Sequence, residues 1–137
     1  MASLFVQEAY CLADLAEIIG RDPGLSNMLR GRANSMAAKI QKLLWDDTQQ
    51  TFANKFTNGT FTHHISPTSF YPLALGASSE QAETMIHKWL FNSSRFCITP
   101  GGDFQGNDPK CYWGLPSISA DDPTYMNAKF IYWRGYT

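Results

Sequence analysis

Trp133 and Arg134 form an adjacent pair of side chains suited to holding a sugar. An indole ring stacks on the apolar face of a pyranose, and a guanidinium donates a planar fork of N–H groups to hydroxyls or carboxylates. The pair lies within residues 130–137, a run that shows no helical pattern. From their chemistry we interpret Trp133 and Arg134 as ligand contacts rather than core residues.

The carboxylates are less suited to catalysis. Asp121 and Asp122 precede Pro123, and an Asp in such a loop more often forms an Asx turn than it holds sugar hydroxyls. Asp46 and Asp47 follow a predicted helix end and are expected to shape a turn. The glutamates fall on solvated faces or first turns of predicted helices, namely Glu8, Glu17, Glu80 and Glu83. No catalytic acid or base is therefore assigned.

No metal site or cofactor is expected. His63 and His64 are adjacent, so in a strand they would point to opposite faces. Asp103, Asn107 and Asp108 lack the spacing of a calcium-binding EF-hand loop. The sequence has no CxxC pair or Cys/His cluster, which argues against a zinc site.

The cysteines and two N-glycosylation motifs (sequons) bear on the cellular compartment of the protein. Cys11, Cys97 and Cys111 are expected to be buried free thiols, although Cys97 and Cys111 flank a glycine-rich loop and could form a disulfide under oxidising conditions. Two sequons, Asn58-Gly59-Thr60 and Asn92-Ser93-Ser94, fit a secretory location. Such short motifs also arise by chance, and no signal peptide is visible, so the compartment stays undefined.

Composition limits the class of protein. The 137 residues are 44% apolar and 17% charged, which suits one core and is too short for two domains. With 11 basic and 12 acidic residues the net charge is -1, so we expect no nucleic-acid or membrane-surface partner. No apolar run approaches the roughly 18–20 residues that span a bilayer, and the chain is interpreted as soluble.

Two helices are expected in the N-terminal part of the chain. An apolar stripe at helical spacing runs through Phe5, Ala9, Leu12, Ala16 and Ile19, and Gly20 ends this helix. Ser26 or Asn27 is expected to cap the second helix. Its stripe runs through Leu29, Ala33, Met36, Ile40 and Leu43 or Leu44. The short connection predicts an antiparallel αα-hairpin.

Smaller elements follow. Residues 52–62 predict a β-hairpin, because Asn58-Gly59 is flanked symmetrically by Thr and Phe and favours a type I′ turn. Residues 70–75 predict a short helix with Pro72 in its first turn and Gly76 at its end. Ser78 and Gln81 form a capping-box pattern. The helix that they open has an apolar face of Ala82, Met85, Ile86, Trp89 and Leu90.

The remainder is a long aromatic loop. From Asn92 to about Met126 there is no periodicity and there are four prolines, and 11 of the 19 aromatic residues lie at or after Trp89. These rings form either a ligand surface or a core packed by loops against a larger body. A loop of this length argues against a complete domain unless it is functional. We interpret residues 1–137 as a single partial domain from a truncated chain.

Four motifs occur in a characteristic order. They are Leu44-Trp45-Asp46-Asp47 before a Phe-rich hairpin, then Ser66-Pro67-Thr68-Ser69-Phe70-Tyr71-Pro72-Leu73, then Leu115-Pro116-Ser117-Ile118-Ser119-Ala120-Asp121-Asp122-Pro123, and finally Tyr132-Trp133-Arg134-Gly135. In this order and spacing they resemble the trehalase-like (α/α)6-barrel glycosidases. The resemblance is closest to glycoside hydrolase family 63, which includes processing α-glucosidase and mannosylglycerate hydrolase relatives.

The resemblance implies a mainly α fold, with αα-hairpins as part of an (α/α)6 barrel, a small β-hairpin and a long aromatic loop. It also implies an inverting glycosidase that acts, when full length, on an α-linked glucosyl or mannosyl substrate held by Tyr132, Trp133 and Arg134. The acid, an Asp, would lie upstream of this segment and the base, a Glu, downstream. We therefore expect the segment alone to be inactive and the remainder of the barrel to complete the site.

Two interpretations from other classes remain open. One is a carbohydrate-binding module that stacks sugars without hydrolysing them. The other is a non-catalytic helical interaction domain, suggested by the paired helices, although no 34- or 40-residue period recurs and the aromatic loop does not fit a repeat.

Overall fold

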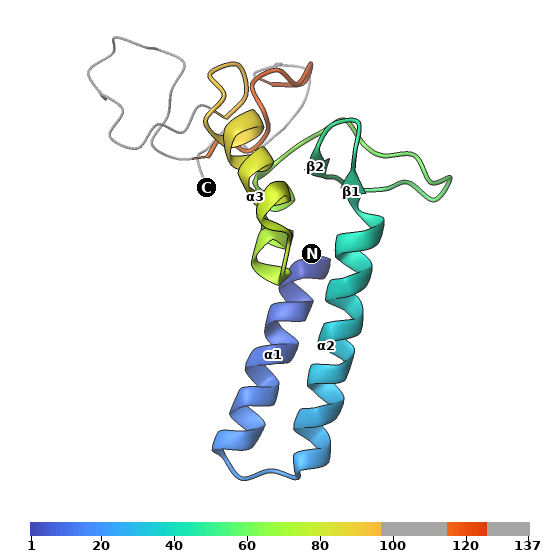
Figure 1. The fold of residues 1–137 in the computed structure, drawn as a ribbon, viewed down its shortest axis with the longest axis vertical. Coiled ribbons are helices and arrows are strands. Elements are labelled where there is room, and N and C mark those ends of the chain that lie inside the picture. The colour runs from blue at the N-terminus through green and yellow to red at the C-terminus, as the bar shows by residue number, and fades with distance from the viewer. Residues whose placement is uncertain (97–114, 126–137) are drawn as a thin grey trace, which may run out of the picture.

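The computed structural model describes residues 1–96 and 115–125 as a mainly helical chain with a small antiparallel sheet (Figure 1). Helices α1 (Ala2–Ile18) and α2 (Pro23–Leu43) lie side by side, which confirms the predicted αα-hairpin. The other elements gather at the end of this hairpin that carries the N-terminus, away from the α1–α2 turn. They are β1 (Trp45–Asp46), β2 (Thr51–Phe52), the 3₁₀ helix η1 (Pro67–Leu75), α3 (Ser79–Met85) and the π-helix η2 (Ile86–Leu90). Within these residues no helix combines the length and apolar character needed to cross a membrane.

Helix α1 ends just before Gly20, and this glycine terminates the helix as the sequence predicts. Gly20 has a φ of 66°, a left-handed conformation that favours glycine. The N–H of Arg21 donates to the carbonyl of Ala16 at 2.8 Å, and the N–H of Gly20 donates to that of Glu17 at 3.1 Å. This pair of bonds is a Schellman motif, which satisfies carbonyls that the helix end would otherwise leave unpaired.

Helix α2 begins earlier than predicted. Asp22 is its N-cap, with a side-chain oxygen that accepts from the N–H of Gly24 at 3.0 Å, and Pro23 occupies the first helical position. The prediction that Ser26 or Asn27 caps this helix was wrong. Both residues already lie inside it, because an Asp-Pro pair satisfies the requirements of a helix start better than the later polar residues do.

The contact between α1 and α2 is built mainly from small side chains. The buried apolar residues of the two helices are Val6, Ala13, Ala16, Ala33, Ala37 and Ile40. The predicted stripes were correct at Ala16, Ala33 and Ile40 but wrong at Phe5, Leu12, Ile19 and Met36, which are exposed. Helix α1 is apolar on two faces, and the spacing of its bulky side chains follows the face that points away from α2. The face toward α2 instead carries alanines, which allow the two helix backbones to approach.

A short ladder precedes the hairpin that the sequence predicted. Strands β1 and β2 pair antiparallel with Trp45 opposite Phe52. The two rings pack edge to face, with their centres 5.0 Å apart. The predicted hairpin over residues 52–62 follows, but it contains a single isolated bridge, between Lys55 and Phe61, in place of a regular ladder.

The turn of that hairpin lies where the sequence predicts, although its type differs. Gly59 donates its N–H to the carbonyl of Phe56 at 2.9 Å, and Phe56 donates to the carbonyl of Thr60 at 2.8 Å. Gly59 has a φ of 85°, whereas Asn58 has no positive φ. The type I′ prediction was therefore wrong, and the loop has the form of a type I turn followed by a left-handed glycine.

The two helical segments after the hairpin are present. Helix η1 begins at Pro67, so Pro72 lies inside it rather than in its first turn, and Gly76 ends it with a φ of 89°. The predicted capping box opens α3, because Gln81 N–H donates to Ser78 Oγ at 3.1 Å and Ser78 N–H donates to Gln81 Oε1 at 3.0 Å.

A second core lies away from the α1–α2 contact. Its buried members are Ala53, Ile65, Trp89 and Phe96, with Phe61, Phe70 and Leu115 packed against them. Residues 115–125 are fastened to this core by backbone bonds. Ser119 N–H donates to the carbonyl of Ile65, and Ala120 N–H donates to that of Arg95, both at 2.9 Å. This segment is the one that carries the Asp121-Asp122 motif.

Candidate functional site

A polar cavity of about 290 Å³ lies between the β1–β2 turn, the end of η2 and residues 115–125. Its volume is near the lower limit of about 300 Å³ for small-molecule sites. The lining combines an indole with cations and carboxylates, a mixture found in ligand sites and in structural ion clusters alike. The residues are Thr48, Gln49, His63, Lys88, Trp89, Arg95, Asp121, Asp122 and Pro123.

Arg95 is the central cation of the cavity wall. Its Nε–H donates to Asp121 Oδ2 at 3.1 Å and its Nη1–H donates to the carbonyl of Lys88 at 3.2 Å. The guanidinium carbon also lies 3.7 Å from the centre of the Trp89 ring, which is a cation–π contact. Because Arg95 covers this face of Trp89, a pyranose cannot stack on the same face. Arg95 stacks on Trp89 and bonds to Asp121, so it attaches residues 115–125 to the end of η2.

Asp122 forms the second attachment. Its Oδ1 accepts from the N–H and the hydroxyl of Thr124 at 2.8 and 2.6 Å, and its Oδ2 lies 2.7 Å from Nδ1 of His64. The bond to Thr124 N–H is an Asx turn, so the structural interpretation of Asp122 is confirmed. Burial alone would raise the pKa of Asp122, but the hydrogen bonds from Thr124 and His64 outweigh burial and hold that pKa below its ordinary value.

Asp46 organises the turn between β1 and β2, as predicted. Its Oδ1 accepts from the N–H of Thr48 at 2.9 Å, and its Oδ2 accepts from Nε2 of Gln49 at 2.6 Å. Burial opposes ionisation here also, but these hydrogen bonds keep the pKa of Asp46 below its usual range. Asp47 accepts from the indole N–H of Trp45 at 2.9 Å, which fixes that ring beside the same turn.

The shifted carboxyl groups are poorly matched to acid catalysis. A hydrogen bond from the Ser26 hydroxyl, followed by those from Arg30, lowers the pKa of Glu17, so its shift has the same direction as those of Asp46 and Asp122. A general acid that protonates a glycosidic oxygen needs a raised pKa. These three groups are therefore ionised at neutral pH and do not provide that proton.

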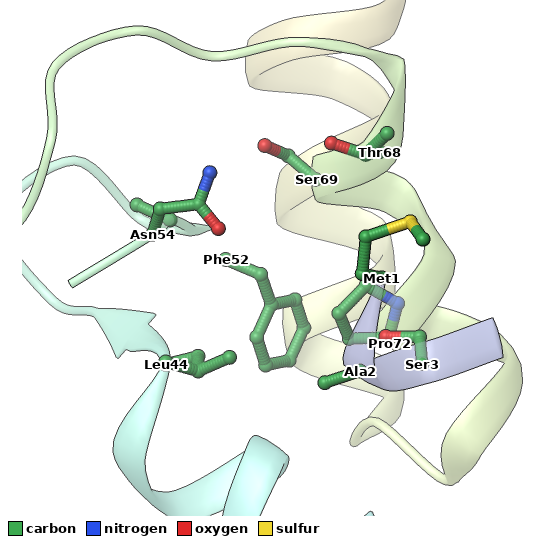
Figure 2. Close-up of a pocket in the computed structure, with 10 residues that line it drawn as sticks. Met1, Ala2, Ser3, Leu44, Phe52, Asn54, Thr68, Ser69 and Pro72 are labelled. Atoms are coloured by element: carbon green, nitrogen blue, oxygen red, sulfur yellow. The ribbon is translucent and has the colours of Figure 1, made fainter. Parts of the chain in front are cut away.

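A second recess, of about 60 Å³, lies beside the start of α1. Figure 2 shows the Phe52 ring next to Leu44 in this pocket, with the polar side chains of Asn54, Ser69 and Thr68 on its other side. The volume is far below the several hundred cubic ångströms of a small-molecule site and matches about two water molecules. The recess is thus too small for a sugar ring.

The remaining predicted residues have different outcomes. Tyr132, Trp133 and Arg134 lie outside the described residues, as do Asp103, Asn107, Asp108, Cys97 and Cys111. Cys11 is exposed, so the expectation of a buried thiol was wrong for it. Within residues 1–96 and 115–125, no group of three or more His, Cys, Asp or Glu side chains is placed to hold a metal ion.

Sequence reasoning missed the contacts that assemble the cavity. Arg95 and Asp121 are 26 residues apart, and His64 and Asp122 are 58 residues apart. No periodicity or local motif connects such positions. The available signal was the third motif of the resemblance, which singled out Asp121 and Asp122 without their partners.

The chain matches the model of a known protein family. The model of the mannosylglycerate hydrolase MGH1-like glycoside hydrolase domain matches residues 1–137. No curated protein matches the chain. The family match covers both cores, the polar cavity and the Tyr132-Trp133-Arg134 element.

Proposed function

The chain belongs to the mannosylglycerate hydrolase MGH1-like glycoside hydrolase family, and from this premise we propose that it is part of an inverting glycosidase. The substrate would carry an α-linked glucosyl or mannosyl residue, as in the glycosidases related to glycoside hydrolase family 63. The family match over the whole of residues 1–137 is the observation that carries this proposal.

The reaction requires two carboxyl groups. One protonates the departing glycosidic oxygen and the other activates a water on the opposite face of the sugar, across a gap of roughly 6.5–9.5 Å. The lowered pKa values of Asp46 and Asp122 do not suit the first role. We propose that both groups come from other parts of an (α/α)6 barrel, and that the 137-residue chain alone hydrolyses no glycoside.

In this proposal the chain supplies substrate contacts. Trp133 would offer an indole face to a pyranose, Arg134 would offer a two-point hydrogen-bonding fork, and Tyr132 would contact the same sugar. Residues 115–125, which come shortly before this element, are fixed by Arg95 through Asp121 and by His64 through Asp122. These two side-chain contacts attach residues 115–125 to the rest of the fold.

Steady-state kinetics of the full-length enzyme on α-glucosides and α-mannosides tests the contacts. Arg134→Ala removes a charged hydrogen bond worth about 1.5–3 kcal/mol, so kcat/KM should fall roughly tenfold to more than a hundredfold. Arg134→Lys should not restore activity, because an ammonium cannot reproduce a planar two-point contact. Trp133→Ala should weaken sugar binding. Arg32→Ala, an exposed position on α2, is the matched control and should leave the kinetics unchanged.

Two outcomes would contradict the proposal. If the Trp133 and Arg134 variants keep wild-type kinetics, or lose activity only because they unfold, then the element belongs to the core. If the full-length protein binds oligosaccharides but releases no sugar, then it is a carbohydrate-binding module.

A further inference from the structure

The tip of the second hairpin carries the sequon Asn58-Gly59-Thr60, and all three residues are exposed. The left-handed Gly59 closes the loop, so Asn58 lies at the tip and outside both cores. In Figure 1 this loop projects away from the helices on the far side of β1. Among residues 1–96 and 115–125, none packs over this tip, which leaves room for a large group.

The hydrogen bonds of the sequon engage one end of the Asn58 side chain. Its Oδ1 accepts from the N–H of Thr60 at 3.0 Å and from the hydroxyl of Thr60 at 2.7 Å. Both bonds use the carbonyl oxygen, so neither occupies the amide nitrogen, which is the atom that carries a glycan. The threonine hydroxyl that defines the motif therefore already lies against the acceptor amide.

The second sequon provides an internal comparison. Asn92 is half-buried, and its Oδ1 accepts from the N–H of Ser94 at 2.9 Å. Its backbone carbonyl accepts from the N–H of Arg95, the residue that clamps Asp121. A glycan on Asn92 would need this side chain to turn outward beside the cavity wall. The fold thus favours modification of the first sequon over the second.

We propose that Asn58 is an N-glycosylation site and that the protein passes through a secretory compartment. In the transfer step, the amide nitrogen of Asn58 forms a bond to the anomeric carbon of an oligosaccharide carried on a polyprenyl diphosphate. The bond between that carbon and the diphosphate oxygen breaks, the polyprenyl diphosphate leaves with the electron pair, and the nitrogen loses a proton to a base of the transferase. This inference does not depend on the glycosidase proposal.

Peptide mass spectrometry of the full-length protein from its own cells tests the site. Trypsin separates the sequons, because residues 56–88 contain only Asn58 and residues 89–95 contain only Asn92. Release of glycans by peptide-N-glycosidase in heavy-oxygen water converts a glycosylated Asn into a labelled Asp. We expect the label in peptide 56–88 and not in peptide 89–95. Recovery of peptide 56–88 without the label would overturn the proposal.

Variants expressed in a eukaryotic host and directed to its secretory pathway test which residues of the triplet the glycan requires. Asn58→Gln and Thr60→Ala should each remove one glycan-sized step in electrophoretic mobility, and Thr60→Ser should retain it at least in part. Thr57→Ala is the matched control, since it changes an exposed residue of the same loop outside the triplet, and it should keep the glycan. Persistence of the step in Asn58→Gln would contradict the assignment, and so would its loss in Thr57→Ala.

Discussion

The α1–α2 hairpin and the head of the molecule, defined as residues 45–96 and 115–125, are held together by different interactions. In the hairpin, alanines bring two helices into contact, and Arg30 links the helices by binding Asp14 and Glu17 near the turn. In the head, buried aromatic rings are combined with polar contacts such as Arg95–Asp121 that connect distant parts of the chain. Local sequence therefore determines the hairpin, whereas the cavity depends on contacts that only the folded chain creates.

The two regions also differ in what they present to solvent. The outer face of α1 is apolar, with Leu4, Phe5, Leu12, Leu15, Ile18 and Ile19 all exposed. A helix that is apolar on opposite sides is typical of a buried position in a larger body. The head instead gathers polar and charged side chains around a cavity. Substitutions of matched chemistry in each region test whether this contrast is correct.

The largest effect is expected for Phe96→Ala in the head. Phe96 is 0% exposed and meets Phe70 edge to face at 5.3 Å. Its removal should lower the free energy of unfolding by about 3–5 kcal/mol, because it creates a cavity in a packed core. Denaturant unfolding measures the change, with Phe91→Ala, at a residue 42% exposed, as the control. Equal losses for the two variants would show that the head is not packed around Phe96.

A smaller loss is expected when the hairpin contact is overfilled. Ala13 is fully buried between α1 and α2, and the helices approach closely because its side chain is small. Ala13→Leu should therefore cost about 1–3 kcal/mol through forced rotamers and helix displacement. Ala38→Leu on the exposed side of α2 is the control and should have little effect on thermal unfolding. An unchanged melting temperature for Ala13→Leu would mean that the helices separate freely.

The same contrast explains which features the sequence could predict. Gly20 and the Ser78–Gln81 capping box act over a few residues, and both were predicted correctly. The Asn58-Gly59 turn was placed correctly, but its type was wrong, because strand pairing around it is limited to one bridge. Local sequence therefore predicts where helices and turns begin and end along the chain better than it predicts which residues pair across strands.

Burial faces and long-range pairs were harder to predict. Phe5 was assigned to the core of the hairpin because bulky side chains dominate a periodicity, yet the contact uses alanines. Arg95 had no assigned role, since its partners Asp121 and Trp89 are brought to it by folding. Trp133 and Arg134 were selected by their chemistry and by resemblance, and they remain a prediction.

An acid-dependent loss of stability should originate mainly in the head. The pKa of Asp122 is lower in the folded than in the unfolded chain, so its ionisation stabilises the fold at pH values above the unfolded pKa of about 3.9. That contribution disappears as the pH falls through the folded pKa. Asp122→Asn should therefore reduce the slope of stability against pH in the acid range.

The stability lost in Asp122→Asn is limited by the exposure of its partner His64. Because His64 is half-exposed, we expect Asp122→Asn to cost about 1 kcal/mol at neutral pH. Glu17→Gln is the matched change in the hairpin, where the carboxylate is exposed, and it should alter the acid slope less. Melting temperatures of the three proteins across the acid range measure the difference. A larger change for Glu17→Gln would assign the acid sensitivity to the hairpin instead.

The smallest effect is expected for Phe5→Ala on the outer face of α1. Phe5 is 60% exposed, so its loss should change the free energy of unfolding by less than about 0.5 kcal/mol. Val6→Ala, one residue along but 1% exposed and facing α2, should cost about 1–2 kcal/mol although it removes fewer atoms. If Phe5→Ala costs as much as Val6→Ala, then the outer face is covered in solution. A melting temperature that rises with protein concentration would then identify a second copy of the chain as the cover, because association stabilises the folded state by mass action.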